Sequence, residues 1–286
     1  MAWETGTAAG YRDLLAKLKI FTSANGWKVE RFVQGSANLA DHEQTDELFI
    51  SSPGKSGLEN LVLGFKTDFS KANDRWNWKL TVSSLYSAGG TFDAMPGSSG
   101  ATQNQYMYLW QHEIQYWFIC DLDHLVVIAI VSGTTHACYL GKLRMYCSLG
   151  HWPRQIGCFG EGIDANGRWS SQGDGFSSFQ HFRNGARRVQ WIDGSYIQPD
   201  SIYPQNLGGD LISGSAPMPS GNRWMLPMTV VSNTHGTLGE FIGCHFLPGQ
   251  ETASGSTIKT ADNKAYLVVQ NIYRNGFRDY MAIGLE

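Results

Sequence analysis

The sequence predicts a mainly β protein built from antiparallel sheets, sandwich-like and arranged in one or two lobes, with a single N-terminal amphipathic α-helix. The segment from Tyr106 to Gly141 is a dense run of aromatic and β-branched residues, broken only around Asp121–Asp123 and Ser132–Gly133. Such side chains pack well on a pleated surface and lose rotamer freedom on a helix. The composition agrees, because 33 glycines and 36 aromatic residues accompany a charged fraction of only 16%.

One segment near the start has helical periodicity. Its apolar positions follow the i, i+3, i+4, i+7 spacing of a helix face, and they are Tyr11, Leu14, Leu15, Leu18 and Phe21. Thr7 is the expected N-cap, and Asn25-Gly26 is the expected stop because glycine tolerates the left-handed conformation. We expect this apolar face to be buried against the chain's own sheet or against a neighbouring subunit, which makes it a candidate assembly face.

The remaining pattern predicts strands joined by short links. A first strand is expected at Trp27–Phe32, and Asp193-Gly194 between apolar flanks predicts a two-residue hairpin turn. Short links favour antiparallel hairpins over parallel crossovers. Further strands are expected at 47–51, 61–69, 76–85, 106–110, 116–120, 124–131, 136–146, 223–232, 239–246, 265–272 and 279–285.

A stretch of low hydrophobicity suggests where the chain divides. Residues 159–185 are rich in Gly, Ser and Asp and predict a loop or linker. We therefore expect an N-terminal region of helix and antiparallel strands at 1–158 and a C-terminal β region at 186–286. The choice between one wrapped sandwich and two lobes stays open.

Composition excludes several classes of protein. The formal net charge is -3 and the basic residues are dispersed, so no footprint for direct nucleic-acid binding is expected. No apolar run has the length of a membrane-spanning helix, and the start lacks the pattern of a secretory signal. Five cysteines without a CxxC pair argue against a disulfide framework and a zinc site. Folding in a cytoplasm with reduced thiols is expected.

Patterns typical of enzymes are absent from the sequence. It contains no Gly-x-Ser-x-Gly elbow, phosphate-binding loop or GxGxxG turn. The most suggestive titratable cluster is Asp121, Asp123 and His124, which we interpret as turn chemistry at a hairpin tip. Two other groups with weak metal-site character are interpreted as structural, and these are His235, Glu240 and His245, and the loops around Asp164 and Asp174. No catalytic residue, metal or cofactor is expected.

Tryptophans offer a possible binding chemistry, because flat rings stack on sugar faces. Trp76 and Trp78 lie two residues apart on one expected strand and therefore share a face, which we interpret as core. Trp169 and Trp191 lie in or beside the long loop region. They are the candidates for ligand stacking.

Four blocks of the chain resemble a group of tailed-bacteriophage and prophage virion structural proteins. The blocks are AWETGTAAGYRDLLAKLKIFTSANGW, RWNWKLTVSSLYSAGGTFDAMPG, YLWQHEIQYWFICDLDHLVVIAIVSGTTHACYLG and YLVVQNIYRNGFRDYMAIGLE. They cover most of the chain, and the resemblance is weakest at 150–222. It implies a non-enzymatic virion component of the tail or baseplate, which contacts other virion proteins in a homo- or hetero-oligomer. A virion module that binds a host-surface glycan is the alternative, and a hydrolase acting on envelope polymer is a third hypothesis.

Overall fold

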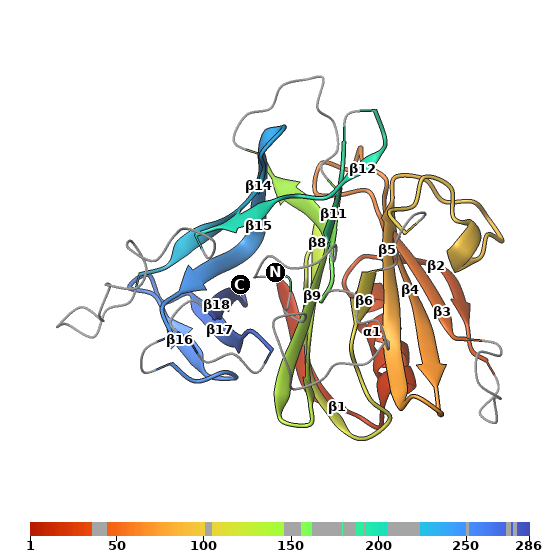
Figure 1. Ribbon diagram of the computed structural model, residues 1–286, viewed down its shortest axis with the longest axis horizontal. Helices are drawn as coiled ribbons and strands as arrows, with labels where there is room; N and C mark the ends of the chain where they lie inside the picture. Colours follow the sequence, from red (N-terminus) through yellow and green to blue (C-terminus); the bar gives the residue numbers. More distant parts are fainter. Residues whose placement is uncertain are drawn as a thin grey trace.

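The computed structural model describes residues 1–35, 45–100, 105–145, 156–161, 179, 187–191, 193–204, 224–249, 252–272, 276 and 279–286. The architecture is mainly antiparallel β with one α-helix, as the sequence predicts. Figure 1 shows the two sheets with the helix α1 between them, and the C-terminal strands β14–β18 of the large sheet on the side away from the small sheet. No helix in the described ranges has the length and apolarity needed to cross a membrane.

A large sheet carries thirteen strands. Its central path runs β1-β7-β8-β9-β15-β18-β17-β16, while β10, β11 and β12 extend from β9 and β13 and β14 extend from β15. Every pairing is antiparallel. The strands are β1 (Ala2–Ala8), β7 (Ile114–Cys120), β8 (His124–Val131), β9 (Thr134–Arg144), β10 (Ile156–Phe159), β11 (Arg187–Gln190), β12 (Tyr196–Ile197), β13 (Ser201–Tyr203), β14 (Leu226–Ser232), β15 (Gly236–Leu247), β16 (Thr257–Lys259), β17 (Ala265–Gln270) and β18 (Tyr280–Gly284).

A small sheet of five antiparallel strands packs against one face of the large sheet, in the order β2-β3-β4-β5-β6. Its strands are β2 (Lys28–Val33), β3 (Glu47–Ser52), β4 (Leu61–Ser70), β5 (Arg75–Ser83) and β6 (Gln105–Met107). A 3-10 turn, η1 (Phe92–Ala94), follows β5. The strands expected at 76–85 and 106–110 end earlier than predicted, because β5 ends at Ser83 and β6 ends at Met107.

The central strands are buried on both faces. Along β8, Leu125 and Val127 face the core shared with the small sheet, whereas Val126 and Ile128 face the core under the C-terminal strands. Neighbouring residues of a strand point to opposite faces. A strand covered on both sides therefore reads as a continuous apolar run, which explains the apolar segment that the sequence shows here.

Helix α1 (Tyr11–Ala24) fills the space between the two sheets. Its five predicted apolar residues are all buried, with Leu14, Leu15 and Leu18 fully inaccessible. Phe21 packs against Phe118 of β7, with ring centroids 5.6 Å apart. The face therefore belongs to the chain's own core, and it is not available as the assembly face for a neighbouring subunit.

The ends of α1 partly correct the prediction. Thr7 is wrong as the N-cap, because residues 2–8 form the strand β1, which the sequence analysis did not predict. Gly10 is the N-cap, and Leu14 N donates to its carbonyl over 2.9 Å. The stop at Asn25-Gly26 is confirmed, and Gly26 has the left-handed φ of 88° that favours glycine.

Two further predictions concern hairpins and cores. The hairpin at Asp193-Gly194 is confirmed by the pairing of β11 with β12, but the predicted two-residue turn is wrong. Trp191 N donates to Ser195 O over 2.7 Å, so three positions separate the bonded residues.

Trp76 and Trp78 are buried in the core, as predicted. Strands from both sides of the expected linker at 159–185 join the large sheet, and most of that linker lies outside the described residues.

Candidate functional site

The turn between β7 and β8 gathers the titratable cluster that the sequence singled out. Asp121 Oδ1 accepts hydrogen bonds from Asp123 N at 2.8 Å, from His124 N at 3.1 Å and from His124 Nδ1 at 2.8 Å. An aspartate that accepts from the backbone two residues ahead forms the turn that this residue type favours. The predicted turn chemistry is therefore present, with the imidazole held in the same network.

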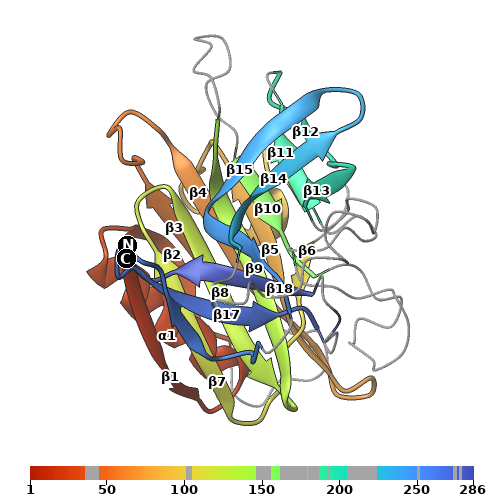
Figure 2. The same cartoon turned by 90° about the vertical axis from the view of Figure 1, so that its left-hand side faces the viewer.

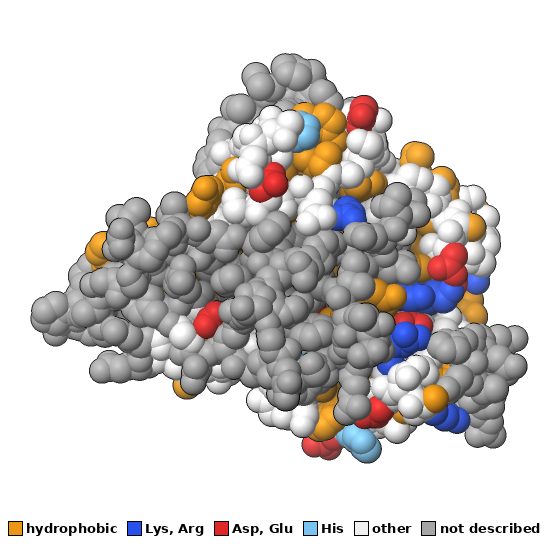
Figure 3. Space-filling model, viewed as in Figure 1, with side chains coloured by type: hydrophobic (Ala, Val, Ile, Leu, Met, Phe, Trp, Pro, Cys, Tyr) orange, Lys and Arg blue, Asp and Glu red, His pale blue; other side chains and the backbone are white. Residues whose placement is uncertain are grey.

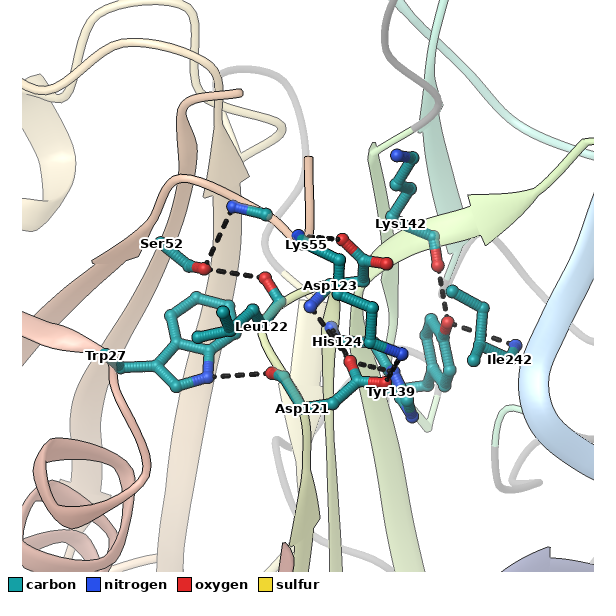
Figure 4. Close-up of polar contacts among 11 residues, drawn as sticks. Trp27, Ser52, Lys55, Asp121, Leu122, Asp123, His124, Tyr139, Lys142 and Ile242 are labelled. Carbon is teal, nitrogen blue, oxygen red and sulfur yellow. Dashed lines mark hydrogen bonds and ion pairs between the residues drawn. The ribbon is translucent and has the colours of Figure 1, made fainter. Parts of the chain in front are cut away.

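Both sheets contact this turn (Figure 4). From the small sheet, Ser52 Oγ donates to the carbonyl oxygen of Leu122 at 2.6 Å, and the amide of Lys55 donates to Asp123 Oδ1 at 2.9 Å. Trp27 Nε1, beyond the end of α1, donates to the carbonyl oxygen of Asp121 at 2.9 Å. We call Asp121, Asp123, His124 and the groups bonded to them the inter-sheet hub.

The hub extends to the C-terminal strands through Tyr139 of β9. Its ring stacks on His124 with centroids 5.3 Å apart and an interplanar angle of 16°. The Tyr139 hydroxyl donates to the carbonyl oxygen of Lys142 at 2.5 Å and accepts from Ile242 N of β15 at 3.3 Å. Full burial raises the pKa of Tyr139 well above its ordinary value, so the hydroxyl stays protonated.

Two opposing effects act on the Asp121 carboxylate. Burial raises its pKa, but hydrogen bonds and charge from His124, together with Lys55 Nζ at 2.5 Å, lower it by more. The net pKa lies well below the ordinary value of 3.8, and Asp121 is therefore ionised in the folded protein at neutral pH. A carboxylate beside an imidazole is the arrangement that orients a base or metal ligand.

Burial limits what this pair can do. His124 is fully buried, and the Asp121 side chain is 8% exposed. A general base must come within hydrogen-bond distance of the proton that it removes. In this structure the turn that carries the pair bonds groups of both sheets, and these contacts hold the segments together.

A second buried pair was missed by sequence reasoning. Glu161 is fully buried after β10, where Oε2 accepts from Tyr108 N at 2.7 Å and from His136 Nδ1 at 3.0 Å, and Oε1 accepts from Ala137 N at 2.8 Å. The carboxylate thereby joins β9 to the segment after β6. The sequence around Glu161 did not predict this buried pair, because a single glutamate in a glycine-rich stretch is typical of a solvated loop.

A charged concavity of about 530 Å³ lies on the outer face of the small sheet. We call it the charged basin, and its lining residues are Arg31, Val33, Gly35, Thr45, Glu47, Lys66, Asp68 and Lys79. The strand registers Glu47↔Lys66 and Lys66↔Lys79 set three charged side chains in a row across β3, β4 and β5. Figure 3 shows the mixed charges gathered over these strands.

Ion pairs organise the charged basin. Arg31 Nε lies 3.0 Å from Glu47 Oε2, Lys66 Nζ lies 3.8 Å from Glu47 Oε1, and Lys79 Nζ lies 3.8 Å from Asp68 Oδ1. The three cations are 18–24% exposed, so they remain partly open to solvent. Alternation of charged with apolar residues along β4 and β5 was the signal in the sequence that could have located this face.

The structure separates the remaining candidates. Trp169, Asp164 and Asp174 lie outside the described residues. Trp191 is half-buried and packs on His235, with ring centroids 4.0 Å apart. His245 packs edge-on against Tyr266, and Glu240 lies 3.8 Å from Arg144. Across the described ranges, no group of three His, Cys, Asp or Glu side chains could hold a metal ion.

Comparison of the sequence with models of known protein families found no matching family. A search of curated proteins likewise found no match.

Proposed function

We propose that this chain is a structural component of a tailed-phage virion, in the tail or baseplate, and that it acts through protein–protein contacts. One observation carries the proposal. Asp121, Asp123 and His124, the titratable cluster most suggestive of chemistry, lie in a hub that binds both sheets and reaches β15. Reactive groups used in this way favour a mechanical role over catalysis.

The surface supports the same proposal. Trp3 and Trp224 are each 48% exposed, and Leu58 is 88% exposed. Tryptophan is enriched at protein interfaces, because its ring buries a large area and also donates a hydrogen bond. The virion setting rests on the four sequence blocks that resemble phage structural proteins.

The test is to locate the chain in finished particles. Particles purified by density gradient are analysed by peptide mass spectrometry and labelled with gold-conjugated antibody against the chain. The proposal expects a fixed copy number per particle and label on the tail, and it expects defective tails when the gene is disrupted. Particles that lack the chain and remain infectious would refute it.

A second candidate function is recognition of a host-surface glycan, and the charged basin is the observation that favours it. Its volume lies within the range of small-molecule sites, and its cations and carboxylates can bond sugar hydroxyls or acidic sugars. Trp191 contributes less to this candidate, because its ring is partly buried and packs on His235.

A glycan array compares the wild type with Lys79→Ala, which removes one partly exposed cation from the charged basin. Lys259→Ala on β16 is the matched control, because it removes an exposed lysine that does not line the charged basin. Glycan binding that is lost in Lys79→Ala and kept in Lys259→Ala supports this candidate. Equal signals from the two variants, or no signal from the wild type, exclude it.

A further inference from the structure

Strand β1 forms an edge of the large sheet. It pairs with β7 through an uninterrupted register from Ala2↔Cys120 to Ala8↔Ile114. Among the described residues, no strand pairs with its other side. Figure 2 shows β1 at the margin of the sheet, beside β7.

The other sheet edges in the described ranges carry features that discourage pairing, and two of them, β12 and β13, have only two and three residues. β16 has three residues and ends at Lys259, and β2 contains Lys28 together with a register shift between Val29 and Arg31. β6 is also three residues long, and its Tyr106 carbonyl already accepts a bond from Glu161 N. Short length, lysine and bulges are the usual means of protecting an edge.

β1 lacks these features. Its sequence AWETGTA contains no proline or lysine, and its pairing has no bulge. Its single charge, Glu4, already accepts a hydrogen bond from the Tyr116 hydroxyl at 2.8 Å. On the exposed side are Trp3, Thr5 and Thr7, which are all solvent-accessible. A regular, unprotected edge of this kind is a template for another strand.

The backbone groups that face outward follow from the β7–β8 hairpin. Asp121 N donates to His124 O at 3.1 Å, which makes this a hydrogen-bonded pair. Bonded and non-bonded pairs alternate in antiparallel sheets, so Phe118 and Tyr116 direct their amides and carbonyls toward β1. The Thr5 hydroxyl agrees, because it donates to Tyr116 O at 2.8 Å.

Glu4 lies opposite Phe118 and Gly6 lies opposite Tyr116. The amides and carbonyls of Glu4 and Gly6 are therefore used in hydrogen bonds to β7. Trp3, Thr5 and Thr7 therefore present their amides and carbonyls to the open side. The side chains of these three residues also lie on the same, exposed face of the sheet. Along a strand, both the direction of the backbone groups and the direction of the side chains repeat every two residues.

We infer that β1 pairs antiparallel with β1 of a second copy of this chain, with Thr5 on the two-fold axis. In this register Thr5 faces Thr5 of the partner, and Trp3 faces the partner's Thr7. All three outward-facing residues of each strand then lie in hydrogen-bonded pairs. The large sheet continues from one protomer into the next, in a closed interface that uses the same surface twice.

Charge selects this register over its neighbours. A shift by two residues toward the start of β1 sets Glu4 opposite Glu4 of the partner, and like charges directly opposite are destabilising. The opposite shift leaves both Trp3 side chains without a cross-strand partner. With Thr5 on the axis, Glu4 faces the partner's Gly6, so no carboxylates oppose each other.

The register predicts which engineered cysteine forms a disulfide with the same residue of the second copy. Opposite residues of a hydrogen-bonded pair have Cα atoms about 5.5 Å apart, within disulfide range. Thr5→Cys should therefore form a covalent dimer under mild oxidation. In Trp3→Cys, the two new thiols lie four residues apart along the strands, roughly 14 Å, which is beyond disulfide reach. Wild type is the control for linkage through native cysteines.

Solution mass provides the second measurement. Analytical ultracentrifugation should find a dimer for the wild type at micromolar concentration, and loss of the dimer in Thr5→Lys, which places two ammonium groups on the axis. Thr257→Lys on β16 is the matched control and should stay dimeric. Melting temperatures of both variants verify that each one folds.

Three results would overturn the inference. They are a monomeric wild type, a Thr5→Lys variant that folds and stays dimeric, and covalent linkage through Trp3→Cys instead of Thr5→Cys. These outcomes are separate from the proposed virion function, because a protein found in particles can still be monomeric in solution.

Discussion

Replacing Asp121 by Asn tests whether the inter-sheet hub stabilises the fold. The carboxamide oxygen keeps the shape of the carboxylate and can still accept from the amides of Asp123 and His124. The substitution removes the negative charge that faces His124 Nδ1 at 2.8 Å and Lys55 Nζ at 2.5 Å. It is therefore a change of charge at nearly constant volume.

The magnitude follows from the burial of each partner. His124 is fully buried, and a hydrogen bond to a charged group is worth about 1.5–3 kcal/mol. The Lys55 side chain is 56% exposed, so its ion pair adds less than about 1 kcal/mol. We expect Asp121→Asn to lower the free energy of unfolding by about 2–3 kcal/mol at pH 7.

The effect should depend on pH with a defined sign. The folded pKa of Asp121 is lower than the ordinary value of 3.8, so the unfolded chain takes up this proton first as the pH falls. The stabilising contribution is present above that ordinary value and is lost below it. The contribution of the Asp121 charge to the difference between wild type and Asp121→Asn should therefore shrink as the pH falls below about 4.

Urea unfolding followed by tryptophan fluorescence measures this difference at each pH. Asp262→Asn is the matched control, because Asp262 is fully exposed and pairs with Lys264 at 2.7 Å. This control should show no resolved change in unfolding free energy. Equal stabilities of wild type and Asp121→Asn at pH 7 would refute the role assigned to the inter-sheet hub.

Three other substitutions or labelling experiments examine the core. Leu18→Ala should cost about 2–5 kcal/mol of unfolding free energy, because the side chain is fully buried between the sheets; a neutral result would place α1 at the periphery. Gly141→Ala should lower the melting temperature strongly, because φ is 128° and a Cβ would lie 2.5 Å from Asp123 O; calorimetry that finds no shift contradicts this. Burial raises the pKa of Cys120 and Cys158 to about 12, so both should resist a thiol reagent at pH 8 until urea unfolds the chain, as peptide mapping would check.

Much of the strand pattern was predictable, because local chemistry determines it. The run from Tyr106 to Gly141 cannot pack well as a helix. Two turns divide it into strands, one at Asp121–His124 and one at the glycine after β8. Residues 2–8 were missed, since a strand of small and polar residues has no apolar stripe. This segment is a strand because it pairs with β7, and the paired residues of β7 lie more than one hundred positions later in the chain.

The candidate site was predictable only in part, for the same reason. The sequence revealed Asp121 and His124 because they are neighbours at a turn. It could not reveal that Ser52 and Trp27 bond the same turn, because those contacts arise when two sheets and a helix meet. Glu161 depends entirely on tertiary packing, so composition assigned it to a loop.

The pairing of β1 with β7 has a consequence for synthesis. A ribosome completes Ala2–Ala8 first, yet their hydrogen-bonding partners at Ile114–Cys120 emerge more than one hundred residues later. At ordinary elongation rates this delay is roughly 5–20 s. Throughout that interval both sides of the nascent strand are open, so neighbouring chains on one messenger have time to pair with each other before either chain has closed its own sheet.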